Sequence, residues 1–175
     1  RGETAAEFGL GYAPPGWDFL MRRLGTNSSS RKQLEVAGML AAQDQRVYDR
    51  FRDRIMFPIR DQRGRIIGFG GRLIGDGKPK YLNSPETPVF HKGRELYGLY
   101  EARRNNRQLQ RVVVVEGYFD CLTLHRVGIS NVVDTLGTAL TREHLRLLKG
   151  FGNRAILVFD SDDAGINAAI RSVDT

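Results

Sequence analysis

Four consecutive valines, Val112–Val115, limit the possible folds of this chain more than any other feature of its sequence. A continuous β-branched run is typical of a strand that is buried on both faces in a parallel sheet. Two further strand-like segments, residues 131–133 and 155–159, follow it, and helical periodicity fills the stretch after each of the three segments. This βαβαβα alternation predicts a small parallel sheet with helices on its faces.

The region before about residue 90 has a different pattern, which mixes helices with strands. Residues 17–24 and 31–36 have helical spacing of their apolar positions. Residues 55–60 and 65–70 have the composition of two strands, and the polar turn between them ends in Gly64. A turn of this kind between two apolar runs predicts a hairpin.

These two patterns divide the chain into two parts, both with an α/β composition. We predict a mixed, basic α/β subdomain over residues 1–92, followed by a parallel-sheet subdomain over residues 93–175. A helix over residues 96–108 is expected to open the second part. Both ends of the sequence resemble cuts within a longer chain, so we expect the parallel sheet to be truncated at its carboxyl end.

Acidic side chains follow two of the predicted parallel strands. Glu116 comes directly after the valines, and Asp160 and Asp162 follow the last strand. Alternation along an extended chain directs Asp160 and Asp162 to the same side, where two carboxylates repel each other unless a cation lies between them. Oxygen ligands favour Mg²⁺ or Mn²⁺ over Zn²⁺. Asp120, in the first turn of the following helix, either interacts with the helix N-terminus or supports the metal.

The middle strand ends at Asp134, which is followed by a loop of small residues up to Thr141. Because ligands gather at the carboxyl ends of parallel strands, Asp134 is a third position at which to look for chemistry. The loop either presents backbone N–H groups to a phosphate or is a plain connector in which Thr141 caps the next helix.

The net charge of +7 is confined to one segment of the chain. Residues 60–111 contain 12 Lys and Arg against 5 Asp and Glu, whereas the remainder contains 15 of each kind. A local basic excess is typical of a surface that binds a polyanion, although a solvated surface without a partner has the same composition. The irregular stretch 79–94, with Lys80, Asn83 and Lys92, suits contacts to a nucleoside triphosphate or a template backbone.

Several classes of protein are excluded by composition. The single cysteine, Cys121, rules out an internal disulfide and fits a reducing compartment. The three histidines lack neighbouring cysteine pairs, so no zinc site of the usual spacing is present. No apolar run approaches the roughly 20 residues that a membrane-spanning helix needs.

Six motifs in chain order resemble those of the bacterial replicative DNA primase family, whose second part has the topoisomerase-primase (Toprim) fold. They are FGLGYAP at residues 8–14, DRFRDRIMFPI at 49–59, GFGGR at 68–72, KYLNSPET at 80–87, EGYFD at 116–120 and DSD at 160–162. Two positions depart from the family pattern: Ser161 replaces a usual glycine, and Asp134 stands where a small apolar residue is common.

The resemblance implies an enzyme that makes RNA primers on single-stranded DNA from ribonucleoside triphosphates during bacterial DNA replication, in the cytoplasm. It implies a DNA-directed RNA polymerase, a nucleotidyltransferase that uses Mg²⁺ or Mn²⁺. Zinc is implied only in an amino-terminal domain that this sequence does not contain, and contact with the replicative helicase only through a further carboxyl-terminal domain. The residues implied to act are Glu116, Asp160 and Asp162 in catalysis and metal binding, Asp120 in metal binding, and Arg72, Lys80, Asn83 and Lys92 in nucleotide and DNA binding.

Three questions stay open at this point. Glu116 is either a metal ligand or a general base. The same acidic motifs occur in Toprim nucleases and topoisomerases, but a topoisomerase needs a tyrosine nucleophile and no tyrosine here has a context that marks one. A primase-like module that binds single-stranded DNA without catalysis is the third reading, against which the intact acidic motifs argue.

Overall fold

The computed structural model describes residues 2–106, 110–161, 165–167 and 170. The chain divides into two compact units. One contains residues 1–8, 59–66 and 91–175, and the other contains residues 9–58 and 67–90. The division into subdomains near residue 92 stays a prediction.

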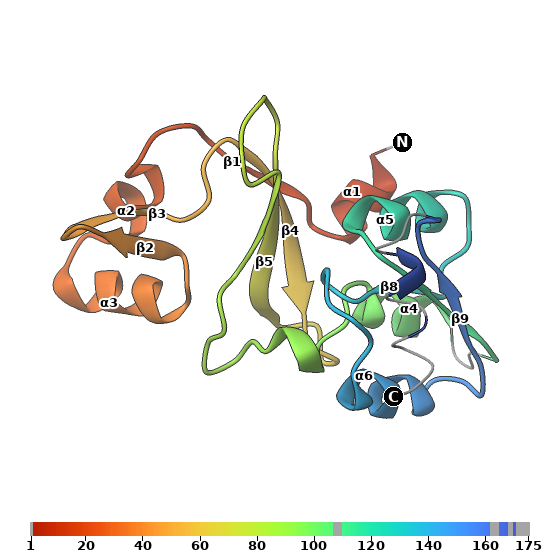
Figure 1. Cartoon of the computed structure of the whole chain (residues 1–175). Coiled ribbons are helices and arrows are strands. Elements are labelled where there is room, and N and C mark those ends of the chain that lie inside the picture. The colour runs from red at the N-terminus through yellow and green to blue at the C-terminus, as the bar shows by residue number, and fades with distance from the viewer. Residues whose placement is uncertain (1, 107–109, 162–164, 168–169, 171–175) are drawn as a thin grey trace. The chain divides into compact units, whose positions relative to one another are not determined.

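The first unit is built on a three-stranded parallel sheet, as expected from the sequence. Its strands lie in the order β8-β7-β9, and Figure 1 labels the two outer ones. Its central strand is β7 (Val112–Val115), which lies between β8 (Val132–Asp134) and β9 (Ala155–Val158). The two outer strands pair with β7 over the same register, so that Val115 faces both Asp134 and Val158. The prediction of a parallel sheet flanked by helices is therefore confirmed.

The helices of this unit cover the sheet and enclose its core. Helix α5 (Tyr118–Arg126) follows β7, α6 (Arg142–Lys149) follows β8, and α1 (Glu3–Glu7) packs near α5. Helix α4 (Leu99–Asn105) precedes β7, and the 3₁₀ turn η1 (Lys92–Arg94) precedes α4. The buried core is formed by Leu96, Leu99, Ala102, Val112, Val114, Val133, Leu140 and Leu148.

Local chemistry explains where two of these helices begin. The hydroxyl of Thr141 accepts the backbone N–H of His144 at 3.1 Å, and Nδ1 of His144 accepts the N–H of Thr141 at 3.2 Å, which together cap α6. The expected helix over residues 96–108 begins only at Leu99. The reason is that the backbone of Tyr97 pairs in antiparallel fashion with Asp134, and Gly98 then turns the chain at a φ of 79°.

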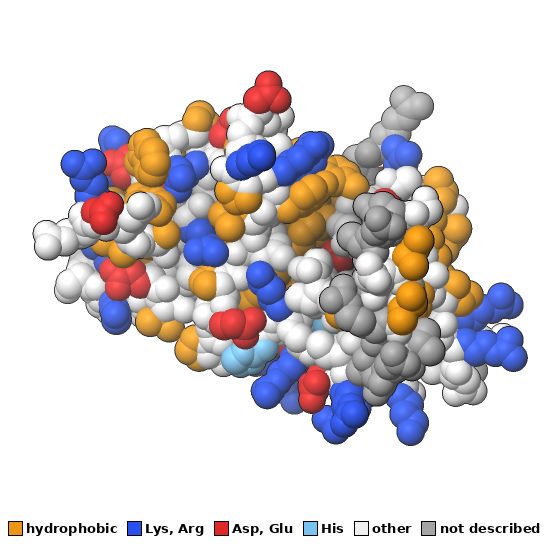
Figure 2. All heavy atoms as spheres, viewed as in Figure 1, with side chains coloured by type: hydrophobic (Ala, Val, Ile, Leu, Met, Phe, Trp, Pro, Cys, Tyr) orange, Lys and Arg blue, Asp and Glu red, His pale blue; other side chains and the backbone are white. Residues whose placement is uncertain are grey.

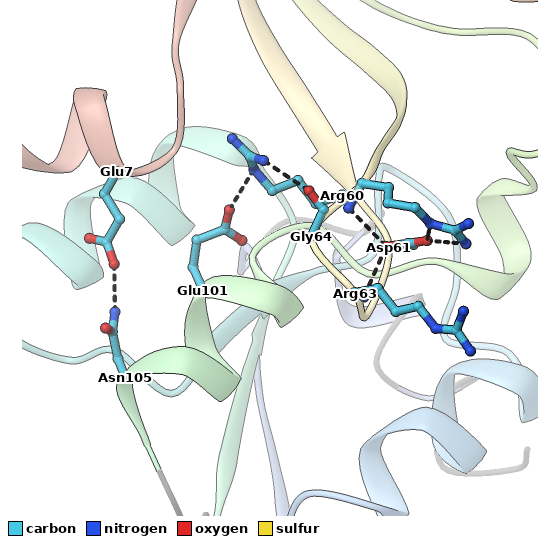
Figure 3. Close-up of polar contacts among 8 residues, drawn as sticks. Glu7, Arg60, Asp61, Arg63, Gly64, Glu101 and Asn105 are labelled. Carbon is cyan, nitrogen blue, oxygen red and sulfur yellow. Dashed lines mark hydrogen bonds and ion pairs between the residues drawn. The ribbon is translucent and has the colours of Figure 1, made fainter.

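The hairpin of this unit carries a largely buried ion pair between Arg60 and Glu101, which Figure 3 shows as a dashed line. Nε of Arg60 lies 3.3 Å from Oε1 of Glu101, and Nη1 of Arg60 donates to the carbonyl of Gly64 at 3.0 Å. Asp61 holds the turn, because its Oδ1 accepts the N–H groups of Arg63 and Arg65. The polar turn predicted between residues 60 and 65 is thus confirmed.

The second unit contains most of a four-stranded sheet with the order β1-β4-β5-β6. Strands β1 (Gly11–Ala13) and β4 (Arg54–Arg60) are antiparallel, as are β5 (Ile66–Leu73) and β6 (Tyr81–Asn83). A separate hairpin of β2 (Leu40–Gln43) and β3 (Arg46–Asp49) packs with helices α2 (Phe19–Leu24) and α3 (Ser28–Val36). Within the described residues, no helix is both long and apolar enough to span a membrane.

Candidate functional site

Three acidic residues lie at the carboxyl edge of the parallel sheet, one at or just after the end of each strand. Glu116 follows β7 directly, Asp134 is the last residue of β8, and Asp160 lies two residues beyond β9. Because the three strands are parallel and in register, their carboxyl ends lie at the same edge. The prediction that Glu116, Asp134 and Asp160 lie at the ends of the three parallel strands is therefore confirmed.

Asp134 is the most deeply buried of these acids, with 1% of its surface exposed. Its Oδ1 accepts the backbone N–H of Leu136 at 3.0 Å, whereas its Oδ2 has no hydrogen-bond partner within the part of the chain that the structure describes. Burial, together with the charges of Asp120 and Glu116, raises the pKa of Asp134 to about 7, although the hydrogen bond from Leu136 opposes the rise. The negative charge of this buried carboxylate is therefore not compensated by a cation or a second hydrogen-bond donor of the described residues.

Asp120 and Glu116 flank the sharp connection between β7 and α5. Gly117 is the N-cap residue of α5, and Asp120 is in its first turn. A Cβ atom placed on Gly117 would lie 3.0 Å from Oδ2 of Asp120, so the Asp120 carboxylate folds back over the residue that follows Glu116. This position fits both roles considered for Asp120, since it is next to the helix N-terminus and to Glu116.

The loop after β9 places Asp160 at the same edge, exposed to solvent. Gly165 is buried, and a Cβ atom at this position would collide with the carbonyl oxygen of Asp160. Only glycine therefore allows the chain to return so close to Asp160. Asp162, the other predicted ligand of this motif, lies outside the described residues.

The metal-binding cluster that the sequence predicts is not assembled by the described residues alone. Among them, no group of three or more His, Cys, Asp or Glu residues could hold a metal ion. The donor type nevertheless fits a hard cation, because Glu116, Asp120 and Asp160 carry the carboxylate oxygens that Mg²⁺ and Mn²⁺ prefer.

The predicted nucleotide-binding and DNA-binding residues fall in both units. Arg72 on β5 pairs with Tyr81 on β6, and Asn83 pairs with Gly70, so these side chains are carried by neighbouring strands. Lys80 precedes β6 and is exposed. Lys92 lies in the other unit, on η1, where its carbonyl is 3.0 Å from Nε2 of His144.

A basic pocket in the second unit was not predicted from the sequence. It has a volume of about 350 Å³, and its lining includes Arg50, Arg52, Arg54 and Lys78. The three arginines occupy alternate positions of the chain, which is the signal that could have identified them. The guanidinium of Arg54 donates hydrogen bonds to the backbone carbonyls of Gly71, Pro79 and Lys80, which hold it in place.

The guanidinium of Arg52 is also part of an aromatic stack. It lies 4.2 Å from the ring centroid of Trp17 and 4.9 Å from that of Tyr48. Trp17 is 64% exposed, so much of its ring is open to solvent beside the arginines. An exposed aromatic ring next to clustered arginines can hold a nucleic-acid base and its phosphates together. Lys and Arg side chains outnumber the acidic ones on the face that Figure 2 shows.

Comparison with known families identifies the class of this fold and then the family. Residues 110–175, which contain the parallel sheet and its acidic edge, match the Toprim domain family. Residues 1–103 match the family described as the N-terminal domain of the DNA primase catalytic core. The chain therefore belongs to the bacterial DNA primase catalytic-core family.

Individual relatives agree with this assignment. The chain is 57% identical over 176 residues to a DNA primase of Pseudomonas putida and 54% identical over 174 residues to the DNA primase of Escherichia coli K12. In both cases 99% of this chain is covered, but it spans only 27% and 30% of the relatives' length.

Solved structures are similar over the whole chain. The Escherichia coli primase catalytic core has 53% identity and a TM-score of 0.94, covering 100% of this chain and 56% of that one. A structure described as the DnaG primase catalytic domain bound to single-stranded DNA has 52% identity and a TM-score of 0.95, covering 100% and 55%.

Proposed function

We propose that this chain is part of the catalytic core of a bacterial replicative primase, a DNA-directed RNA polymerase that makes RNA primers on single-stranded DNA. The observation that carries the proposal is the acidic edge of the parallel sheet, where Glu116, Asp134 and Asp160 end three strands of a Toprim fold. Family membership and more than 50% identity to two DNA primases support it.

In the proposed reaction, a primer 3′-hydroxyl attacks the α-phosphate of a ribonucleoside triphosphate, and pyrophosphate leaves. Glu116, Asp160 and Asp162 would hold Mg²⁺ or Mn²⁺, with Asp120 in support. Such a cation neutralises phosphate charge and lowers the pKa of an attacking hydroxyl. Glu116 would either ligate the cation or accept the proton of the 3′-hydroxyl, and its position directly after β7 supports either role.

The basic side chains would hold the substrates. Arg72, Lys80, Asn83 and Lys92 are proposed to contact the triphosphate and the template backbone, since lysine and arginine balance phosphate charge. We add the pocket lined by Arg50, Arg52 and Arg54 as a site for single-stranded template, because an exposed aromatic ring, Trp17, stacks on one of its clustered arginines.

Other contacts and the location are proposed from the family alone. The replicative helicase, with which a primase forms the primosome, and a structural zinc would be bound by domains outside this sequence. We place the protein in the cytoplasm with the bacterial replication machinery. The two subdomains proposed from the sequence, residues 1–92 and 93–175, would contribute the basic surface and the acidic edge respectively.

The proposal is tested in a chimera, in which this chain replaces the matching 174-residue region of the Escherichia coli primase. The chimera should synthesise primers on single-stranded DNA, and Glu116→Ala or Asp160→Ala should lower the rate by about 10²-fold or more, the loss expected when transition-state charge stabilisation is removed. Asp76→Ala, in an exposed loop, is the matched control.

Two results would contradict the proposal. Near-normal priming by the Glu116→Ala and Asp160→Ala chimeras would show that these two acids are not needed for primer synthesis. DNA cleavage without primer synthesis would favour a Toprim nuclease, and DNA binding that neither activity accompanies would favour a non-catalytic module.

A further inference from the structure

His144 is a fully buried histidine to which the proposed function assigns no role. Its exposed fraction is 0%, and it lies in the first turn of α6. Both nitrogens of its ring meet backbone groups: Nδ1 lies 3.2 Å from the nitrogen of Thr141, and Nε2 lies 3.0 Å from the carbonyl oxygen of Lys92. His144 therefore joins α6 to a residue 52 positions earlier in the chain, one that is proposed to bind nucleotide.

The two partners of the ring fix its protonation state. The backbone N–H of Thr141 can only donate, so Nδ1 of His144 accepts and carries no proton. The carbonyl of Lys92 can only accept, so Nε2 carries the proton and donates it. Burial lowers the pKa of His144, although hydrogen bonds with the backbone of Lys92 and Glu95 oppose the fall. The ring is therefore neutral at pH 7, in the one tautomer that satisfies both contacts.

Thr141 makes a second connection to η1 beside that of His144. Its hydroxyl donates to the carbonyl of Gly93 at 2.6 Å and accepts the N–H of His144 at 3.1 Å. A Cβ atom placed on Gly93 would lie 3.5 Å from Cγ2 of Thr141, so η1 packs directly against this side chain. Two consecutive carbonyls of η1, those of Lys92 and Gly93, are thus held by two side chains of one helix cap, and we call this arrangement the η1 clamp.

The segment that follows η1 is bonded to the same part of the chain at its other end. The backbones of Tyr97 and Asp134 exchange two N–H···O hydrogen bonds, at 2.9 and 3.0 Å. Asp134 ends β8, and a short loop leads from it to the cap of α6. Residues 92–97 are therefore attached at both ends to one continuous stretch, residues 134–144, within the first unit. This double attachment gives the backbone of Lys92 a defined place in that unit.

We propose that His144 is a positioning residue, whose neutral ring, with the help of Thr141, holds the backbone of Lys92 where the Lys92 side chain can balance the phosphate charge of a nucleoside triphosphate. A lysine side chain has many rotamers, so a fixed backbone is what limits the region that its ammonium group reaches. The inference rests on the proposed function, which gives Lys92 its part in nucleotide binding. It goes beyond that function because His144 acts through the backbone of Lys92 and belongs to none of the predicted sets of site residues.

Two substitutions of His144 separate the clamp from the helix cap. Asparagine has an oxygen that can replace Nδ1 as the acceptor for Thr141, but its side chain is too short to reach Lys92. Glutamine has an amide nitrogen that can replace Nε2 as the donor to Lys92. The measurement is the KM for ATP and the kcat of primer synthesis in the chimera with the Escherichia coli primase.

The expected result is a change in KM without a matching change in kcat. His144→Asn should raise the KM for ATP by about 10-fold, a loss of the size that one hydrogen bond in binding gives, and should leave kcat within about 2-fold. His144→Gln should keep the KM within about 3-fold of that of the unmodified chimera, because the bond to Lys92 is retained. A purely structural loss would instead lower the active fraction, and with it kcat, in both variants.

Lys92→Ala tests whether His144 acts through Lys92. It should raise the KM for ATP, and His144→Asn should raise it little further in this background, because the side chain that the clamp places is absent. Asp76→Asn, which changes an exposed acid of the second unit, should leave the KM unchanged. If circular dichroism shows that His144→Asn does not fold, Thr141→Val, which removes the bond to Gly93, is compared with Thr141→Ser, which keeps it.

Each outcome decides one of the two proposals. Equal KM values for His144→Asn and His144→Gln, or an undiminished effect of His144→Asn in the Lys92→Ala background, would refute the inference and leave Lys92 in its proposed role. An unchanged KM in Lys92→Ala, in a chimera that makes primers, would remove Lys92 from nucleotide binding and the inference with it. A chimera that makes no primers would contradict the proposed function and the inference together.

Discussion

Removal of Arg60 should destabilise the chain through the charge that it leaves behind. Glu101 has a nearly buried side chain, 4% exposed, and its partner Arg60 is 23% exposed. Burial raises the pKa of Glu101, and Arg60 opposes that rise. Taking away one partner of a buried pair costs about 3–5 kcal/mol. The Nε–Oε1 distance of 3.3 Å, without hydrogen-bond geometry at Nε, favours the lower end of this range.

We therefore expect Arg60→Met to lower the free energy of unfolding by about 3 kcal/mol at pH 8. In a Glu101→Gln background no charge is left unpaired, and the same change should cost only about 1 kcal/mol, for the lost bond to Gly64. Urea denaturation followed by circular dichroism measures all four members of this double-mutant cycle.

The pH dependence gives a second check on the same pair. A carboxyl group whose pKa is raised by folding contributes stability at low pH that is lost as the pH rises through the folded pKa. Without Arg60 the pKa of Glu101 rises further, so the cost of Arg60→Met should shrink as the pH falls from 8 toward 5. Equal costs with and without the Glu101 charge would refute this explanation.

Three further changes test other features of the structure. Gly98→Ala should lower the free energy of unfolding by about 2 kcal/mol or more, because the φ of Gly98 is 79° and the new Cβ would lie 2.7 Å from Sγ of Cys121. Gly128→Ala should lower it by only about 1 kcal/mol, because Gly128 has a φ of 89° but open space around it. Thermal unfolding measures both. Burial raises the pKa of Glu95 to about 7, so wild-type stability should fall as the pH rises from about 4.5 to 7, and Glu95→Gln should flatten this part of the pH–stability curve. Thr141→Val should cost about 1 kcal/mol in urea denaturation through loss of the α6 cap, and Thr141→Ser should restore it.

The parallel sheet could be predicted because its signal is local. Each strand is a short apolar run, and the right-handed connections between parallel strands leave few arrangements for three of them. The positions of Glu116 and Asp160 followed from the strand ends alone. The family motifs added the identity of the fold, which the family comparison confirms.

What the sequence did not reveal depends on contacts between distant residues. Helix α2 begins at Phe19 and not at residue 17, because the carboxylate of Asp49 accepts the N–H groups of Leu20 and Met21 from 29 and 28 residues away. The stack of Arg52 on Trp17 likewise joins segments that no periodicity connects.

The burial of Asp134 is a similar case within the candidate site. The sequence predicts a carboxylate at a strand end, near the other acids, but not its burial. The backbone pairing of Tyr97 with Asp134 adds a chain segment beside β8, and the covered side chain results from this tertiary contact. The roles assigned to Glu116, Asp120, Asp160 and Asp162 stay predictions.

The interleaving of the two units along the chain sets an order for their completion during synthesis. Every residue of the second unit lies between positions 9 and 90, whereas most of the first unit comes from residue 91 onward. A ribosome therefore finishes the unit with the Trp17 pocket before the central strand β7 exists. The first unit needs residues 1–8 and 59–66 together with the segment from residue 91 onward, so it is expected to fold after the second unit.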